Sequence, residues 1–327
     1  MVQIVRRQFL TLLGGAAAWP LAARAQQAAS PVVGFLNWGS ARLSGRVVAA
    51  FRAGLAEVGY IEPQNVSIEL RWAGTQSERL HGLAAELVQR KVAVIVAGGF
   101  GGPILAAKAA TSTIPIVFAY GGDPVKQGLV ESFNHPGGNV TGVTTNNAEL
   151  GGKWLSLVGD LVPRAAPVGF LSTDSSYFSE DQKSQMLAAA RALGRQIIIL
   201  EPRGDREYEM AFKTLVQREA GALIVGPFAF RNIDKIVTLA AHYKMPTIYP
   251  RRDYVEAGGL MSYAADYADT FHQAGVYAGR ILRGAKPSDL PVMLATKFEL
   301  VINLKAAQAL GIEMPSTLLA TADEVIE

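Results

Sequence analysis

The feature that most constrains the fold is a short apolar segment that occurs twice. The first copy, VGFLNWGS, covers residues 33–40, and the second, VGFLSTDS, covers residues 168–175, 135 positions later. Each copy is typical of a buried strand whose C-terminal end opens into a loop before a helix. In an open α/β sheet, ligands bind at this kind of junction. The two copies therefore predict two similar lobes whose strand ends face one another.

Strand and helix patterns alternate after each copy. In the first half, strands are expected at 31–36, 65–72, 92–97 and 114–119, and helices at 44–59, 77–90 and 104–111. In the second half, strands are expected at 168–171, 196–200, 222–225, 247–249 and 259–264, and helices at 182–193, 208–219, 233–242 and 267–282. Corresponding elements lie 129 to 135 residues apart, which indicates an internal repeat.

This alternation predicts an α/β fold of two Rossmann-like lobes with parallel sheets and right-handed crossovers. A further strand at 298–303 and a helix at 304–310 follow two complete lobes, so the chain is expected to cross a hinge several times. We assign residues 31–146 and 267–290 to the N-terminal lobe, and residues 147–266 and 291–327 to the C-terminal lobe.

The first 25 residues have the composition of an export signal. Arg6 and Arg7 precede an apolar run over residues 9–21, and the small-residue site at 23–25 suits cleavage. The run is shorter than the ~20 apolar residues that a membrane span needs. The R-R-x-F-L pattern fits a twin-arginine signal, although a Sec signal also carries basic residues here, so both routes stay open.

Charge and cysteine content exclude several functions. Removal of the signal lowers the 31 basic residues to 28, which equals the 28 acidic residues. The mature chain is therefore close to neutral, and no nucleic-acid surface is expected. The chain has no cysteine, which excludes disulfides, a thiolate metal site and a lipidated cysteine after the signal. We expect a protein free in the periplasm, with no direct membrane insertion.

The sequence shows no enzymatic constellation. The four histidines have no metal-binding spacing, and there is no G-x-S-x-G elbow. Gly98–Gly102 is a glycine-rich loop, but Ile104 stands where a dinucleotide-binding loop needs its third glycine. We therefore expect no catalytic residues, no cofactor and no metal.

Small, polar and aromatic residues gather instead at the predicted strand ends. Backbone amides at helix N-termini, together with Arg252, suit a carboxylate. Aromatic side chains there suit a flat apolar ligand, and Asp123 or Asp266 could accept hydrogen bonds from a ligand ammonium. The candidate ligand-binding residues are Trp38, Gly39, Ser40, Gly98, Gly99, Phe100, Gly101, Asp123, Pro124, Ser175, Ser176, Tyr177, Phe228, Arg231, Arg252, Asp253 and Asp266.

Each candidate also has a purely structural interpretation. Trp38 and Phe228 have the size of core residues, and Arg252 could pair with Glu256 at the surface. Asp123 precedes a proline and is typical of a helix cap. The binding prediction rests on the joint placement of these residues at strand ends.

The chain resembles the family of ABC-transporter substrate-binding proteins that includes the tryptophan/tyrosine-binding type. The stretches that carry the resemblance are FLTLLGGAAAWPLAARAQ (9–26), IPIVFAYGGDPVKQGLV (114–130), PGGNVTGV (136–143), VEAGGLMSY (255–263) and KFELVINLKAAQALG (297–311). The resemblance spans essentially the whole mature chain. It implies a type I periplasmic binding fold, a ligand in the cleft and an ABC permease in the inner membrane as partner. By position, it implies cleft loops at 39–40, 98–101, 123–124, 174–177, 228–232, 252–253 and Asp266.

Two stretches differ from family members that bind aromatic amino acids, which commonly carry serine or threonine there. These stretches are Gly98–Gly102 and residues 227–228. A glycine-lined wall facing an aromatic wall with an arginine favours a bulkier aromatic or carboxylated ligand.

The sequence thus predicts a monomeric periplasmic receptor that captures a small aromatic or carboxylated, amino-acid-like solute by hinge closure. The receptor is expected to deliver this solute to the permease. Two alternatives stay open. One is a ligand-sensing subunit for a membrane receptor, and the other is a periplasmic α/β hydrolytic enzyme, against which the missing nucleophile–base pair argues.

Overall fold

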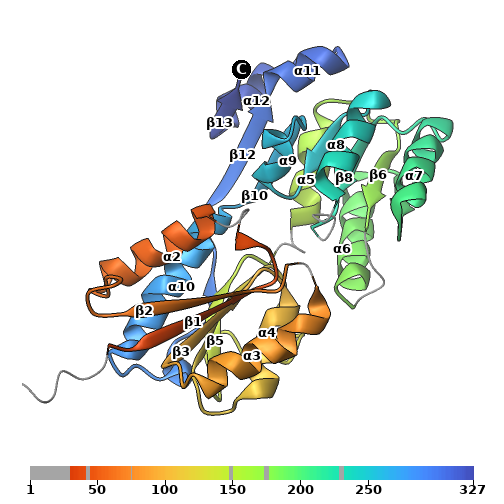
Figure 1. The fold of residues 1–327 in the computed structure, drawn as a ribbon. Helices are drawn as coiled ribbons and strands as arrows, with labels where there is room; N and C mark the ends of the chain where they lie inside the picture. The colour runs from red at the N-terminus through yellow and green to blue at the C-terminus, as the bar shows by residue number, and fades with distance from the viewer. Residues whose placement is uncertain (1–29, 42–44, 75, 147–149, 173–176, 228–231) are drawn as a thin grey trace, which may run out of the picture.

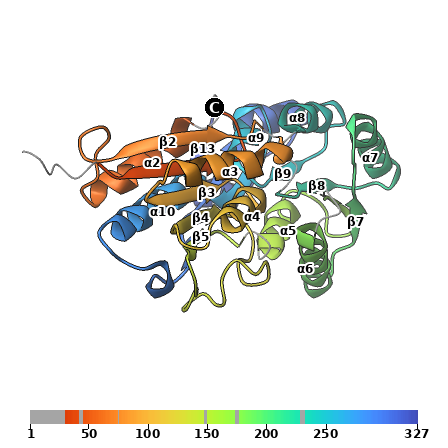
Figure 2. The ribbon, with the colours of Figure 1, turned by 60° about the horizontal axis from the view of Figure 1, so that its bottom comes forward.

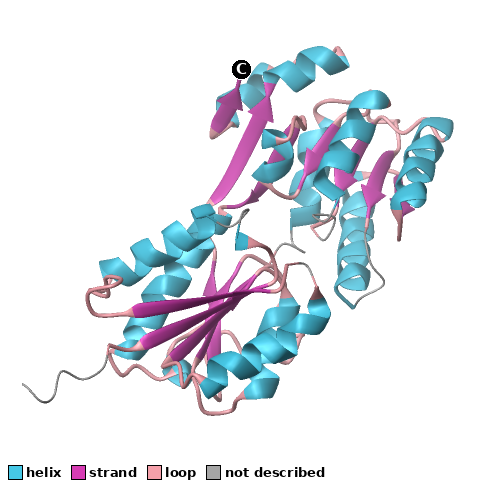
Figure 3. Ribbon diagram, in the orientation of Figure 1, coloured by secondary structure: helices cyan, strands magenta, loops and turns pink. Residues whose placement is uncertain are grey.

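The computed structural model describes residues 30–327 except 42–44, 75, 147–149, 173–176 and 228–231. The expected signal lies outside the described residues. The structure confirms the predicted α/β class with two lobes, which are separate bodies in Figure 1. Helices flank both sheets, as Figure 3 shows. In the described part of the chain, no helix is both long and apolar enough to cross a membrane.

The first lobe contains a six-stranded sheet. Its strands, in spatial order, are β11 (Met293–Leu294), β5 (Val140–Thr144), β4 (Ile116–Tyr120), β3 (Val94–Gly98), β1 (Val32–Asn37) and β2 (Ser67–Trp72). All neighbouring strands pair in parallel. Their C-terminal ends therefore lie along one edge of the sheet.

The second lobe contains a seven-stranded sheet. Its strands, in spatial order, are β13 (Glu324–Ile326), β12 (Phe298–Asn303), β10 (Met261–Ala265), β9 (Thr247–Tyr249), β8 (Ala222–Val225), β6 (Val168–Leu171) and β7 (Ile197–Leu200). The order β10-β9-β8-β6-β7 repeats the order β5-β4-β3-β1-β2 of the first lobe. The internal repeat predicted from the sequence is thus present in the topology.

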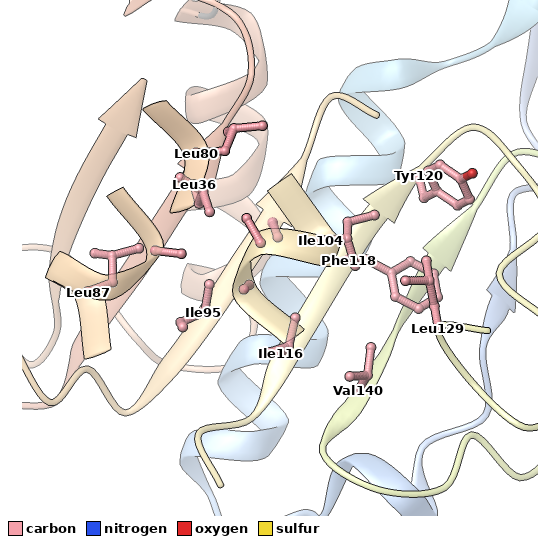
Figure 4. Packing of buried hydrophobic residues seen from close by; sticks show 14 of the residues in the cluster. Leu36, Leu80, Leu87, Ile95, Ile104, Ile116, Phe118, Tyr120, Leu129 and Val140 are labelled. Atoms are coloured by element: carbon pink, nitrogen blue, oxygen red, sulfur yellow. The ribbon is translucent and has the colours of Figure 1, made fainter. Parts of the chain in front are cut away.

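Apolar side chains on both sheet faces account for the layered structure, since strands of parallel sheets are buried on both sides. In the first lobe, α3 (Leu80–Gln89) and α4 (Gly101–Ala110) cover one face. Figure 4 shows Leu36, Ile95 and Phe118 of the sheet close to Leu87 and Ile104 of these helices. In the second lobe, α5 (Gly151–Gly159), α6 (Tyr177–Leu193), α11 (Leu304–Leu310) and α12 (Ser316–Thr321) cover one face, and α7 (Asp205–Gln217), α8 (Ile233–His242) and α9 (Arg252–Glu256) cover the other.

Two glycines let helices α2 (Gly45–Glu57) and α10 (Tyr267–Leu282) pack closely on the remaining face of the first sheet. The two helices lie side by side in Figures 1 and 2. A Cβ atom on Gly54 would lie 1.9 Å from the backbone oxygen of His272, and one on Gly275 would lie 2.3 Å from that of Phe51. Only glycine permits this backbone approach.

The chain crosses between the lobes three times: from β5 to α5, from β10 to α10 and from β11 to β12. Two details differ from the sequence prediction. The sequence prediction places residues 291–327 in the second lobe, but residues 293–294 form β11 in the first sheet. The last crossing therefore comes after β11 and not before residue 291. In addition, β12 runs antiparallel to β10 because the chain re-enters the second lobe at the end of the sheet that faces the hinge.

Candidate functional site

The C-terminal strand ends of both lobes line a small cavity of about 60 Å³ between them, called here the interlobe cavity. The first lobe contributes Gly99, Phe100, Tyr120, Gly121 and Thr145. The second lobe and the β10–α10 crossing contribute Pro227, Pro250, Arg251, Ala264, Ala265 and Tyr267. Strand ends from two separate sheets thus meet at one place, as the duplicated sequence segment predicts.

A wider cavity of about 640 Å³, called here the charged chamber, adjoins the interlobe cavity and shares four lining residues with it. The shared residues are Arg251, Ala264, Ala265 and Tyr267. The charged chamber lies among the first turns of α2, α8 and α10, helix α9 and the strands β10 and β12. Its lining carries both basic and acidic side chains, in contrast to the interlobe cavity.

Arg251 follows β9 and lines both cavities. Its Nη2 donates to a carboxylate oxygen of Asp253, and its guanidinium carbon lies 5.1 Å from the ring centroid of Tyr267. The Nε atom is buried and has no hydrogen-bond partner among the described residues. Burial favours a lower pKa for this guanidinium, but the Asp253 carboxylate and Tyr267 outweigh that effect and raise the pKa, so the group stays charged.

Tyr267 begins α10 at the second hinge crossing. Burial raises the pKa of its phenol to about 12, although the Arg251 charge and a hydrogen bond from the Gly99 backbone work in the opposite direction. The phenol is therefore neutral at physiological pH and available as a hydrogen-bond donor.

Arg252, the arginine that the sequence analysis selected, points to a different set of partners. Its Nε donates to Glu256 at 2.8 Å, its Nη1 to Glu299 at 3.3 Å and its Nη2 to Glu324 at 2.8 Å. All three guanidinium nitrogens are thus engaged by carboxylates. Arg252 lines the charged chamber but not the interlobe cavity.

The glycine loop after β3 is shaped for close packing. A Cβ atom on Gly98 would lie 2.4 Å from the Phe271 ring, and Gly99 has a positive φ of 105° that other residues rarely adopt. Phe100 follows and lines the interlobe cavity. Gly101 then begins α4.

The loop after β1 packs against Phe100. Trp38 is buried, contacts the Phe100 ring edge-to-face at 5.2 Å, and donates from Nε1 to Ser77 Oγ at 3.4 Å. The amide of Gly39 donates to Asn37 Oδ1 at 2.8 Å. Trp38, Gly39 and the following Ser40 do not line either of the two cavities. Trp38 therefore supports Phe100 from behind in this arrangement.

The predicted aspartates have different surroundings. Asp123 accepts backbone hydrogen bonds from Val125 and Lys126 at 2.9 and 3.1 Å, so it caps the turn that contains Pro124 and lines neither cavity. Asp253 pairs with Arg251 and lines the charged chamber.

Asp266 also lines the charged chamber and caps α10. Its Oδ1 accepts the amides of Ala268 at 2.9 Å and Asp269 at 3.1 Å. Arg46 of the first lobe lies 3.7 Å from Asp266 and 3.8 Å from Glu299, so one side chain links the first lobe to the second and third hinge crossings.

Several candidates fall outside what the structure describes. These are Ser175, Ser176, Phe228 and Arg231, together with the side chain of Tyr177, whose backbone begins α6. Among the described residues, no group of three or more histidine, aspartate or glutamate side chains is arranged to hold a metal ion.

Sequence reasoning missed Arg251, Tyr267, Tyr120 and Thr145. Each stands at or just beyond the C-terminal end of a strand, where ligands bind in α/β folds. This position is the feature of the sequence that could have identified them. It does not distinguish Arg251 from Arg252, because both follow β9.

The sequence model of one family, described as ABC transporter substrate binding protein, matches residues 43–326. The tyrosine-binding protein of Clostridioides difficile strain R20291 is 27% identical over 265 residues, which cover 80% of this chain and 76% of that protein. The structure of an ABC domain in complex with L-Trp from Streptococcus pneumonia is 26% identical with a TM-score of 0.82, covering 91% of this chain and 100% of that chain. A ligand-free, open substrate-binding protein with adhesive properties from Clostridium difficile is 24% identical with a TM-score of 0.72, covers 91% and 99% of the two chains, and shares the fold.

Proposed function

The chain belongs to the ABC transporter substrate-binding protein family, and we propose that it captures an aromatic or carboxylated solute between its lobes and delivers it to a permease. The observation that supports this proposal most strongly is the interlobe cavity, to which strand ends of both lobes contribute. A solute that contacts Phe100 of one lobe and Arg251 of the other favours the lobe arrangement in which both contacts are made. The mechanism is then hinge closure about the three crossings.

The size of the interlobe cavity supports a mechanism with lobe movement. Its volume of about 60 Å³ is well below the roughly 300–1,000 Å³ of typical ligand sites. An aromatic solute therefore enters only when the lobes separate or the lining side chains move. The adjoining charged chamber provides a wide route of entry.

Two kinds of observation support an aromatic, amino-acid-sized solute. The rings of Phe100, Tyr120 and Tyr267 line the interlobe cavity and suit a flat apolar body. Two of the relatives named above bind tyrosine or L-Trp by their descriptions. Capture and delivery of a solute require no chemical reaction, so we infer that the chain is a binding protein and not an enzyme.

The location follows from the same role. We propose that the protein is exported, by the twin-arginine or Sec route, and acts as a monomer in the periplasm, where it meets the permease in the inner membrane. Neither nucleic acid nor membrane insertion has a part in this function.

A thermal-shift screen of the purified protein against aromatic amino acids, aromatic acids and branched-chain amino acids tests the proposal. A solute at 100 times its Kd stabilises the folded protein by about 2.7 kcal/mol, which raises Tm by several degrees. If no solute raises Tm, or if the protein turns over a compound from the panel, the proposed function is wrong.

A further inference from the structure

The interlobe cavity has an unusual charge distribution. Among the described residues that line it, Arg251 is the only charged side chain, and no carboxylate accompanies it there. The rest of the lining consists of three aromatic rings and of glycine, alanine, proline and threonine. Such a lining matches a flat apolar body that carries one negative charge.

We propose that Arg251 binds the carboxylate of the solute, and that the solute is an aromatic acid without an ammonium group. This inference rests on the proposed function, because it names the class of solute held at the same site. It differs from capture of an aromatic amino acid, in which an ammonium must also be bound.

Arg251 is oriented for this role by groups on two of its sides. Asp253 engages Nη2, and the guanidinium carbon lies over the Tyr267 ring, 5.1 Å from its centroid. Both contacts reduce the freedom of the side chain before a ligand arrives, which lowers the entropic cost of binding. The buried Nε has no partner among the described residues, and a buried donor left unsatisfied is costly. A ligand carboxylate that accepts from Nε removes that cost.

An ammonium group has no acidic partner among the described residues that line the interlobe cavity. Four of the five acidic side chains that line the charged chamber are already engaged. Asp253 pairs with Arg251, while Glu256 and Glu299 accept from Arg252. The fourth, Asp266, accepts two backbone amides. The fifth, Asp234, lies in the first turn of α8, where the helix dipole favours its charge. An ammonium would therefore have to displace one of these four pairings or reach Asp234, which lines the charged chamber and not the interlobe cavity.

Matched pairs of ligands test the absence of an ammonium. The pairs are phenylpropionate and L-phenylalanine, hydroxyphenylpropionate and L-tyrosine, and indolepropionate and L-tryptophan, whose members differ only by the ammonium group. Isothermal titration calorimetry on the full protein measures each Kd. We expect the acid of at least one pair to bind at least about tenfold more tightly than the matched amino acid. The amino acid must bury an ammonium group without an acceptor, and the acid carries no such group.

Matched variants of the two adjacent arginines test whether Arg251 binds the carboxylate of the solute. Arg251→Gln is expected to weaken binding of the preferred acid by at least about tenfold, and Arg252→Gln is expected to leave it unchanged. Arg251→Lys keeps the charge but loses the planar fork, so an intermediate loss is expected. Circular dichroism and the Tm of each ligand-free variant establish that it is folded, and Arg251→Lys carries the test if Arg251→Gln does not fold.

The outcomes separate the two proposals. If amino acids bind and their matched acids bind no more tightly, the inference is wrong while the proposed function stands. The inference is also wrong if Arg251→Gln binds the preferred acid as tightly as the wild type does. Where Arg251→Lys carries the test, the same result for that variant overturns the inference. If no member of any pair and no compound of the wider screen binds, the proposed function itself is wrong, and the inference with it.

Discussion

Asp266 stands where the chain leaves β10 of the second lobe and enters α10 of the first. Burial acts to raise the pKa of its carboxyl group, but the Asp269 amide, Arg46, Lys297 and the Ala268 amide together lower the pKa below its usual range. The carboxylate therefore stays charged at physiological pH. It holds the first turn of α10 at a hinge crossing.

Asp266→Ala removes this cap and is expected to destabilise the protein by about 1 kcal/mol at pH 7. Asp266→Asn retains an acceptor for the amides and should cost less, because the facing cations are half exposed and contribute little. Urea unfolding at pH 7 measures both. Equal stability of Asp266→Ala and the wild type would show that the cap has no energetic role.

The same carboxylate gives a pH dependence of known sign. The folded pKa of Asp266 lies below its unfolded value, so its contribution is fully present above about pH 4 and is lost as pH falls through the folded pKa. The stability difference between wild type and Asp266→Asn should therefore shrink towards pH 2 in urea unfolding experiments. A difference that grows on acidification would contradict this account.

The sequence predicts a binding region at strand ends, where the interlobe cavity lies, but it does not single out most of the side chains that line this cavity. It placed the site at strand ends because a short apolar run followed by glycine or serine is a local pattern. It preferred Arg252 to Arg251, and both directly follow the same strand. The choice depends on Glu299 and Glu324, which bind Arg252 from 47 and 72 positions away and which no local pattern reveals.

At the scale of elements, the contact between α2 and α10 links the first and last parts of the N-terminal lobe. It depends on Gly54 and Gly275, where side chains would meet backbone oxygens of the opposite helix. A helix that follows a hinge crossing is thus anchored to the lobe it enters. We therefore expect a movement of the lobes about the hinge to carry α10 with the first lobe as one body.

Gly54→Ala is expected to destabilise the protein by about 1–3 kcal/mol, because its Cβ atom would lie 1.9 Å from the His272 oxygen and the helices must separate. Gly82→Ala in α3 is the matched control. Nothing lies within 4 Å of a Cβ atom there, so alanine should stabilise the helix by up to about 1 kcal/mol. Urea unfolding of both variants measures the contrast, and similar effects at the two sites would rule out the packing argument.

The order and type of the main elements follow from sequence periodicity, because buried strands and amphipathic helices have local patterns. The direction of a strand and the presence of very short strands do not follow from periodicity. The two residues of β11 are too few to show a period, and only pairing with β5 defines them. The antiparallel direction of β12 likewise depends on where the third crossing returns to the sheet.

For the whole molecule, the repeated strand order places two equivalent sheet edges opposite each other, and the three crossings connect them. This architecture brings Phe100 and Arg251, which are far apart in the sequence, to one cavity. A solute bound there is expected to change the separation of the lobes. The absence of native cysteines makes this change directly measurable, since two introduced cysteines can be labelled specifically.

Leu105 of α4 and Met210 of α7 are suitable positions, because they lie in different lobes and the two residues are 45% and 63% exposed. Spin labels on Leu105→Cys and Met210→Cys report the distance between the lobes by double electron–electron resonance. Saturation with the compound that raises Tm most is expected to narrow the distance distribution and shift it to the closed-lobe value. A compound that binds but leaves the distribution unchanged would contradict capture by hinge closure.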